Sequence, residues 1–235
     1  MAATTADFRF EYAQSAGIGG ADSRLEIDGD QATWYHEPPV AVIERGVIGV
    51  FRTQVSAAER QALAAAMPAG STPGLRPGMP AQTARLKSAG QERVVALAPT
   101  DPAADRLKAE ARKIIERARS RPYRALRIDL VQVEPPRVRI ENVGSEPLVL
   151  PLDEQSLFVE SSPTSPVEWQ RAGARSWRRT FTIAPGGHAD VDLPAVLPAA
   201  RPRWVRAMFQ RPAADSLEDV GGTASSRHVR LDAAR

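Results

Sequence analysis

Three residues with the chemistry of metal ligands, His188, Asp190 and Asp192, alternate with apolar residues in the stretch HADVDL. Imidazole and carboxylate groups both bind transition metals. Alternate side chains of a strand share one face and stand about 6.5–7 Å apart, so three of them converge on one ion only where the strand bends. We therefore expect a solvated strand face here, with metal binding as the alternative.

Nucleophilic catalysis needs a serine, threonine or cysteine beside a general base. The chain has no cysteine, three histidines and no Gly-x-Ser-x-Gly motif. One histidine, His36, lies in the aromatic stretch WYHEPP, where packing among rings is the favoured interpretation. The glycine-rich stretch GIGG at residues 17–20 precedes a predicted strand instead of the helix that a phosphate-binding loop requires, so it indicates a turn. We assign no catalytic residue, no cofactor and no metal ligand.

Arginine supplies most of the positive charge of the chain, which has 31 basic and 28 acidic residues and a formal net charge of +3. Between residues 171 and 211, eight arginines stand against two aspartates, and tryptophans are interleaved. Such a pattern suits nucleic acid or an acidic protein, although most surface arginines are simply solvated. Solvated arginines without a specific partner are the favoured interpretation; an acidic protein is the next and nucleic acid is less favoured, with Arg175, Arg178 and Arg179 as candidate contact residues.

The first half of the chain is predicted to fold into short strands and two helices, which would position a functional site there. Alternating apolar residues predict four strands before residue 56, and SAG at residues 88–90 predicts a later hairpin. Ser56 with Glu59 forms a capping box, which predicts a helix that ends at Pro68. A second helix is predicted from Pro102, capped by Asp101, to just before residue 122, with this apolar stripe: Ala103, Leu107, Ala111, Ile114, Ile115 and Ala118.

Between the first helix and the hairpin lies PAGSTPGLRPGMP, residues 68–80, with four prolines and three glycines. Prolines restrict the backbone, so less entropy is lost on binding than with a glycine–serine loop. Leu75, Arg76 and Met79 lie in this stretch without a periodic element to bury them. We expect them to contact a partner, with folding back onto their own domain as the alternative.

After Pro122 the apolar period becomes two and predicts nine short strands separated by turns. In VRIENVGSEPLVLPL, residues 138–152, two alternating runs flank a turn at residues 142–147, which predicts a hairpin that faces one core. Residues 212–226 are small and polar and are expected to form a flexible loop. The pattern predicts an α+β domain over residues 1–121, an antiparallel sheet with two helices, and an all-β immunoglobulin-like sandwich over residues 122–235.

Two family resemblances accompany this pattern. The C-terminal half resembles bacterial immunoglobulin-like domains of the intracellular proteinase inhibitor type, in ENVGSEPLVL and RRTFTIAPGGHADVDLP. The N-terminal half resembles emfourin, a small bacterial α/β inhibitor of a metalloprotease, in GIGG, LEID and VSAAERQAL. Both resemblances imply inhibition of a bacterial protease, and neither supplies an inhibitory residue.

The expected function is therefore that of a non-catalytic bacterial binding or adaptor protein, including inhibition of a protease. The alternatives are an enzyme or metal-binding protein with an unrecognised site, and a nucleic-acid binder that uses the basic C-terminal half. The N-terminal stretch has neither the basic nor the apolar region of a secretory signal. No apolar run approaches the roughly 18 residues of a membrane-spanning helix. We expect no membrane partner and a cytoplasmic location.

Overall fold

The computed structural model describes residues 7–15, 22–37, 46–68, 81–97, 102–163, 166, 168–198, 203–211 and 220–232. These residues form two compact units. The described part of the second unit comprises residues 46–49 and 124–232, and the other described residues belong to the first unit. Residues 46–49 thus group with the second unit although they precede the expected boundary at residue 122. Independent folding of residues 1–121 and 122–235 stays a prediction.

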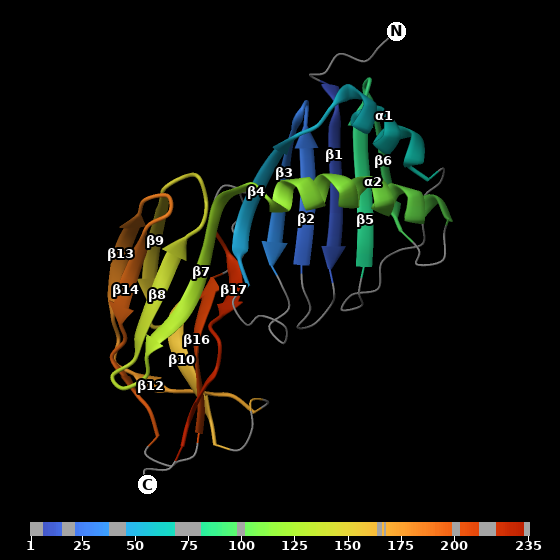
Figure 1. The fold of residues 1–235 in the computed structure, drawn as a ribbon. Helices are drawn as coiled ribbons and strands as arrows, with labels where there is room; N and C mark the ends of the chain where they lie inside the picture. The colour runs from blue at the N-terminus through green and yellow to red at the C-terminus, as the bar shows by residue number, and fades with distance from the viewer. Residues whose placement is uncertain are drawn as a thin grey trace. The chain divides into compact units, whose positions relative to one another are not determined.

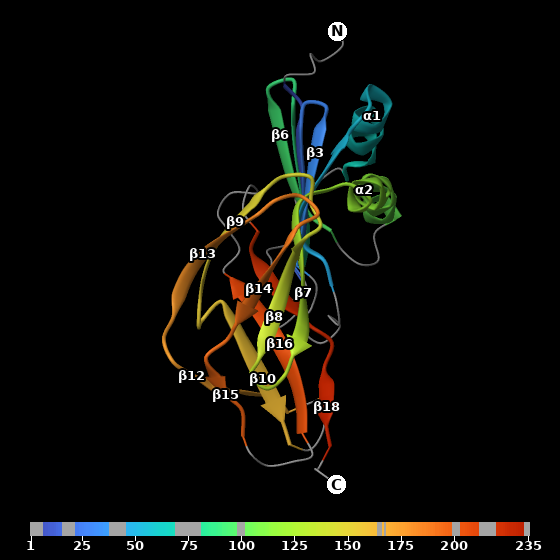
Figure 2. The same ribbon diagram turned by 60° about the vertical axis from the view of Figure 1, so that its left-hand side comes forward.

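The first unit contains an antiparallel sheet and two helices, as the sequence predicts, and both helices lie on one face of the sheet (Figures 1 and 2). The first four strands are neighbours in chain order, as expected of a meander. The sheet has the strand order β4 (Ile48–Gln54, with residues 50–54 in this unit), β3 (Gln31–Glu37), β2 (Asp22–Asp28), β1 (Arg9–Ser15), β5 (Ala81–Ser88) and β6 (Gln91–Ala96).

Helix α1 (Ala57–Ala66) begins with the predicted capping box. The Ser56 backbone N–H donates to the Glu59 carboxylate at 2.8 Å, and the Glu59 N–H donates to Ser56 Oγ at 3.2 Å. Helix α2 (Pro102–Arg119) begins at the predicted proline and crosses the strands (Figure 1). Its cap, Asp101, lies outside the described residues.

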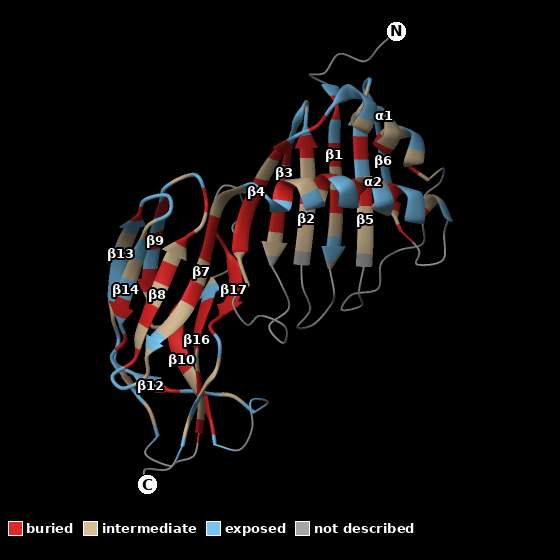
Figure 3. Ribbon diagram, in the orientation of Figure 1, coloured by how far each residue is buried: buried red, intermediate tan, exposed pale blue. Residues whose placement is uncertain are grey.

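The buried face of α2 agrees with the predicted stripe at Leu107, Ala111, Ile114 and Ala118. Ala103 and Ile115 are only half-buried, because they lie on the two opposite edges of this stripe. The buried residues of α2 are Ala104, Leu107, Ala111, Ile114 and Ala118. They pack over the apolar rows of the sheet, so the core of the first unit lies between the sheet and its helices (Figure 3).

The hairpin predicted at residues 88–90 is confirmed. Ser88 pairs with Gln91, so β5 and β6 are joined by a two-residue turn. Both turn residues have positive φ, 51° at Ala89 and 75° at Gly90. These values are typical of the tight turns whose twist matches that of the flanking strands.

The second unit is built from short antiparallel strands around one core. All nine predicted strand segments contain a strand, and the described residues include further short ones. One set of neighbours is β14 (His188–Asp192), β8 (Arg137–Asn142) and β7 (Pro122–Gln132). The remaining strands are β9 (Leu148–Asp153), β10 (Leu157–Ser162), β11 (Gln170–Arg171), β12 (Gly173–Ala174), β13 (Arg178–Ile183), β15 (Ala195–Val196), β16 (Arg203–Arg211), β17 (Gly222–Ser225) and β18 (Val229–Leu231).

The hairpin predicted for residues 138–152 is wrong. Strand β8 pairs with β7 and β14, whereas β9 pairs with β13. Both strands nevertheless face the same core, to which they contribute Val138, Ile140, Leu148, Leu150 and Leu152. The alternation of apolar and polar residues shows which side of a strand is buried, but it does not show which strand lies beside it. Two consecutive strands that belong to different sheets can therefore have the same sequence pattern as a hairpin.

The flexible loop predicted for residues 212–226 is wrong in its last part. Residues 222–225 form β17, pair with β16 and are all buried. Ala224 lies opposite the buried Phe209. Small and polar residues have little intrinsic preference for strands, so a strand composed of them is recognised only by its backbone pairing.

Candidate functional site

The polar residues of the candidate site form a row at one end of the sheet in the first unit. They lie on the face that the helices cover, and backbone pairing places them side by side in the order His36, Ser23, Gln14 and Gln82. The neighbouring row on the same face is Trp34, Leu25, Tyr12 and Ala84, all buried. Because adjacent strands are about 4.8 Å apart, the polar row is about 14 Å long.

A cavity of about 560 Å³ lies between this row and α2, and we call it the strand-end cavity. Tyr12 and Trp34 line it beside the polar row. Its volume is within the range of about 300–1,000 Å³ that is usual for small-ligand sites. One flank of α2 lines the other side with Lys108, Arg112, Ile115, Glu116 and Arg119.

Stacked rings fix one end of the strand-end cavity. The Trp34 indole N–H donates to Ser23 Oγ at 2.8 Å. The Trp34 ring stacks on the His36 ring with a centroid distance of 4.6 Å and an interplanar angle of 19°. The Arg119 guanidinium carbon lies 5.3 Å from the centroid of the Trp34 ring. This confirms that His36 packs among aromatic rings, and it holds the imidazole in one orientation.

Two buried polar atoms of the row have no hydrogen-bond partner among the described residues. They are Nδ1 of His36 and Oε1 of Gln82. Burial, and secondarily the charge of Arg119, lowers the pKa of His36 to about 4, so its imidazole is neutral at pH 7. An unsatisfied buried polar atom costs about 1–3 kcal/mol, which a ligand that bonds to it would recover.

Positive charge dominates the wall that α2 contributes, with Lys108, Arg112 and Arg119 against Glu116. Lys108 Nζ lies 3.6 Å from an Asp105 carboxylate oxygen. Within the part of the chain that the structure describes, Arg112 and Arg119 have no ion-pair partner within 4 Å. Guanidinium groups that have no paired carboxylate and lie beside apolar surface attract a carboxylate or phosphate.

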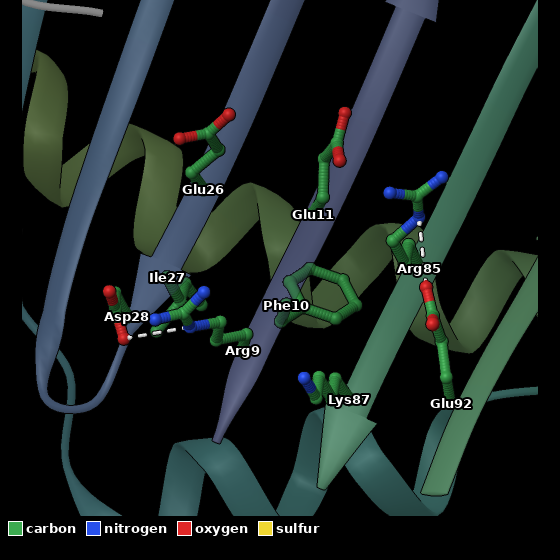
Figure 4. Close-up of a pocket in the computed structure, with 9 residues that line it drawn as sticks. All are labelled: Arg9, Phe10, Glu11, Glu26, Ile27, Asp28, Arg85, Lys87 and Glu92. Atoms are coloured by element: carbon green, nitrogen blue, oxygen red, sulfur yellow. Dashed lines mark ion pairs between the residues drawn. The ribbon is translucent and has the colours of Figure 1, made fainter. Parts of the chain in front are cut away.

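A second concavity of about 380 Å³ lies on the open face of the same sheet (Figure 4). Its charges largely compensate one another. Arg9 lies 3.5 Å from Asp28, and Arg85 lies 3.5 Å from Glu92. The other charged residues that line it are Glu11, Glu26 and Lys87.

Glu11 and Glu26 are directly opposite in the backbone register of this open face. The pKa of Glu26 is raised, chiefly by burial and also by Glu11, with Arg24 opposing the shift. Since this surface has balanced charges and ion pairs of its own, the strand-end cavity is the better candidate for a binding site.

The strand-end cavity was missed in the sequence, although each strand contains its signal. The sequence shows Phe10 and Tyr12 followed by Gln14, and Trp34 followed by His36, at successive positions of one face. A change from apolar to polar residues along one face of a single strand does not by itself indicate a site. Only the register shows that this change occurs at the same end of the sheet in four strands, β1, β2, β3 and β5.

The contact residues predicted in the second half of the chain lie in and just before β13. Arg175 is exposed, and its backbone N–H donates to the Pro194 carbonyl at 3.2 Å. Arg178 is exposed and lies 3.9 Å from Asp153, whereas the Arg179 guanidinium lies 5.3 Å from the ring centroid of Phe181. Their contact with a partner stays a prediction.

The contact residues predicted in the proline-rich stretch, Leu75, Arg76 and Met79, lie outside the described residues, as does the GIGG stretch at residues 17–20. Their part in binding also stays a prediction.

Several arginines of the basic second half are engaged within the protein. Arg206 pairs with Glu160 at 2.7 Å, and its guanidinium lies 4.2 Å from the Trp169 ring centroid. Arg203 is buried and pairs with Glu134. Guanidinium groups held in this way are less available to phosphates than free surface arginines, which does not favour nucleic-acid binding through these residues.

The strand face predicted at residues 188–192 is confirmed as solvent-exposed. Asp190 accepts two hydrogen bonds from Arg139, at 2.8 and 2.9 Å. Asp192 accepts one from Arg137 at 2.5 Å. Each carboxylate is therefore directed at an arginine of β8.

No family model, curated protein or solved structure matches the chain. Neither α1 nor α2 is long and apolar enough to span a membrane, and these are the helices that the described residues contain.

Proposed function

We propose that the chain is a non-catalytic binding protein that recognises an acidic group of another protein in the strand-end cavity. The observation that carries this proposal is the pair of arginines on α2, Arg112 and Arg119, whose charges have no carboxylate partner among the described residues. They line the same cavity as the unsatisfied atoms of His36 and Gln82. A partner that supplies negative charge and hydrogen bonds would satisfy both features at once.

Other features support finer parts of this proposal. The family resemblances favour a protease as the partner. Strands on several sides of one core in the second unit favour an immunoglobulin-like sandwich. In the second unit, the exposed Arg175 and Arg178 also favour an acidic partner.

Binding of an acidic peptide tests the proposal. The probe is a glutamate-rich peptide, acetylated and amidated at its ends, and its counterpart has glutamine in place of glutamate. We expect calorimetry to detect binding of the glutamate peptide alone. The double variant Arg112→Ala/Arg119→Ala should weaken binding about tenfold or more, because each charged hydrogen bond contributes about 1.5–3 kcal/mol.

The matched control is Arg106→Ala/Lys113→Ala, which removes the same charge from α2 at exposed positions that do not line the strand-end cavity. Its affinity should stay within about twofold of the parent protein. Equal losses in the two double variants would show that the peptide responds to net charge alone. That result, or a parent protein that binds no acidic peptide, whether the carboxylate belongs to a side chain or to the chain terminus, would refute the proposal.

A further inference from the structure

The polar atoms of the strand-end cavity define its ligand more narrowly than charge does. Resting on the function proposed above, we infer that the cavity binds the C-terminal carboxylate of a polypeptide.

Arg112 and Gln82 lie at the same end of the cavity. Arg112 precedes Arg119 by seven residues, which is about 10 Å along α2, and α2 crosses the strands (Figure 1). Because the Arg119 guanidinium lies over Trp34 of β3, Arg112 lies about two strand spacings further along the sheet, near β1. Tyr12 lies opposite Ala84, and Gln14, two residues further along β1, lies opposite Gln82. Gln82 lies on β5, the next strand after β1, so Arg112 and the buried amide oxygen of Gln82 line the same end of the cavity.

These two groups have complementary needs. A guanidinium donates hydrogen bonds and matches a carboxylate with two parallel bonds. The Oε1 atom of Gln82 accepts and has no donor among the described residues. A ligand that suits both carries a carboxylate with an N–H nearby, as the last residue of a polypeptide does. The same chemistry occurs in an N-acylated amino acid.

The length of the site favours a polypeptide over a single residue. The opposite end holds His36, stacked on Trp34 beneath the guanidinium of Arg119. It lies about 14 Å from Gln82 along the row. Four extended units span about 13–14 Å, so three terminal residues and the acyl group that precedes them reach from the carboxylate end to the imidazole. The neutral His36 ring can receive an apolar or aromatic side chain there.

A pair of tripeptides that differ in one group tests the inference. The probes are acetyl-Phe-Ala-Ala as the free acid and as the C-terminal amide, titrated into the full chain by calorimetry. Neither probe contains an acidic side chain. We expect the acid to bind and the amide to bind about tenfold to hundredfold more weakly. Arg112→Ala should abolish the difference between acid and amide, and Arg106→Ala should preserve it.

Gln82→Met separates the N–H contact from the charge contact. Methionine keeps the length of the side chain and removes the accepting oxygen, and it also relieves an unsatisfied buried atom, so the variant should fold. It should weaken binding of the acid while leaving the preference for acid over amide. Acetyl-Phe should bind more weakly than the tripeptide acid; equal binding would overturn the polypeptide as the source of the carboxylate.

The test separates this inference from the proposed function. If the tripeptide acid and amide bind equally or not at all, while the glutamate-rich peptide still binds through Arg112 and Arg119, the cavity recognises acidic side chains. The inference is then wrong and the proposed function stands. If no probe binds, both are wrong.

Discussion

Asn142 should be the most sensitive single polar position of the second unit. Its side chain is almost fully buried, with 1% exposed. Its amide nitrogen donates to the carbonyls of Glu146 and Ile183, at 2.8 and 2.9 Å. Its amide oxygen accepts from the Gly144 N–H at 2.9 Å. One side chain thus joins the end of β8 to the turn that follows it and to the end of β13.

The cost of Asn142→Ala follows from these three bonds. The substitution leaves two carbonyls and one N–H without partners in a buried place. At about 1–1.5 kcal/mol for each lost bond, the free energy of unfolding should fall by about 3–5 kcal/mol. This is a large share of the roughly 5–15 kcal/mol that stabilises most domains.

Urea unfolding followed by tryptophan fluorescence and circular dichroism measures this change. Ser145→Ala is the matched control, because Ser145 is an exposed residue of the same turn and its substitution should change stability by about 0.5 kcal/mol or less. Asn142→Asp keeps the acceptor for Gly144 and loses both donors, so it should be nearly as damaging as the alanine variant. A loss below about 1 kcal/mol in Asn142→Ala would refute the reasoning.

Two further predictions concern acid stability and a close backbone contact. A hydrogen bond from Arg117 lowers the pKa of Glu59 from 4.5 to about 2. Glu59→Gln should therefore cost about 1–2 kcal/mol above pH 4.5, and the gap to the parent protein in urea unfolding should close as the pH falls to 2; a constant gap would contradict this. At Gly49, where φ is 134°, an added Cβ would overlap the Arg124 carbonyl oxygen. Gly49→Ala should lower Tm by several degrees, whereas Gly173→Ala, with open space around it, should not; equal Tm values would contradict this.

Features fixed by near neighbours in the chain could be predicted. The capping box of Ser56 and Glu59 depends on residues three apart, and the start of α2 at Pro102 depends on the restricted φ of proline. The turn at residues 89–90 depends on two residues between alternating runs. In each case the residues that determine the feature lie within one helical turn or one β-turn of each other in the sequence.

Features that depend on pairing between distant strands could not be predicted. The apolar residues of β8 and β9 were assigned to the correct core but to the wrong partner strands. Strand β17 consists of Gly222, Thr223, Ala224 and Ser225, and this sequence has no alternation of large apolar and polar residues. Its place is set by β16, whose pairing partner cannot be read from local composition.

The strand-end cavity depends both on the alternation within each strand and on the pairing between strands. The free-energy cost of its unsatisfied polar atoms favours a role in binding. The neighbouring row of the same face is apolar and buried, with Trp34 and Tyr12 beneath α2. Apolar residues at the next row would remove the cost of burying the unsatisfied atoms of His36 and Gln82, about 1–3 kcal/mol each. Stability alone therefore favours apolar residues at these positions, because a buried polar group without a partner lowers the free energy of unfolding relative to an apolar group of the same shape. Such a cost is recovered when a ligand supplies the missing hydrogen bonds, and the guanidinium of Arg112 beside the row favours a ligand with a negative charge.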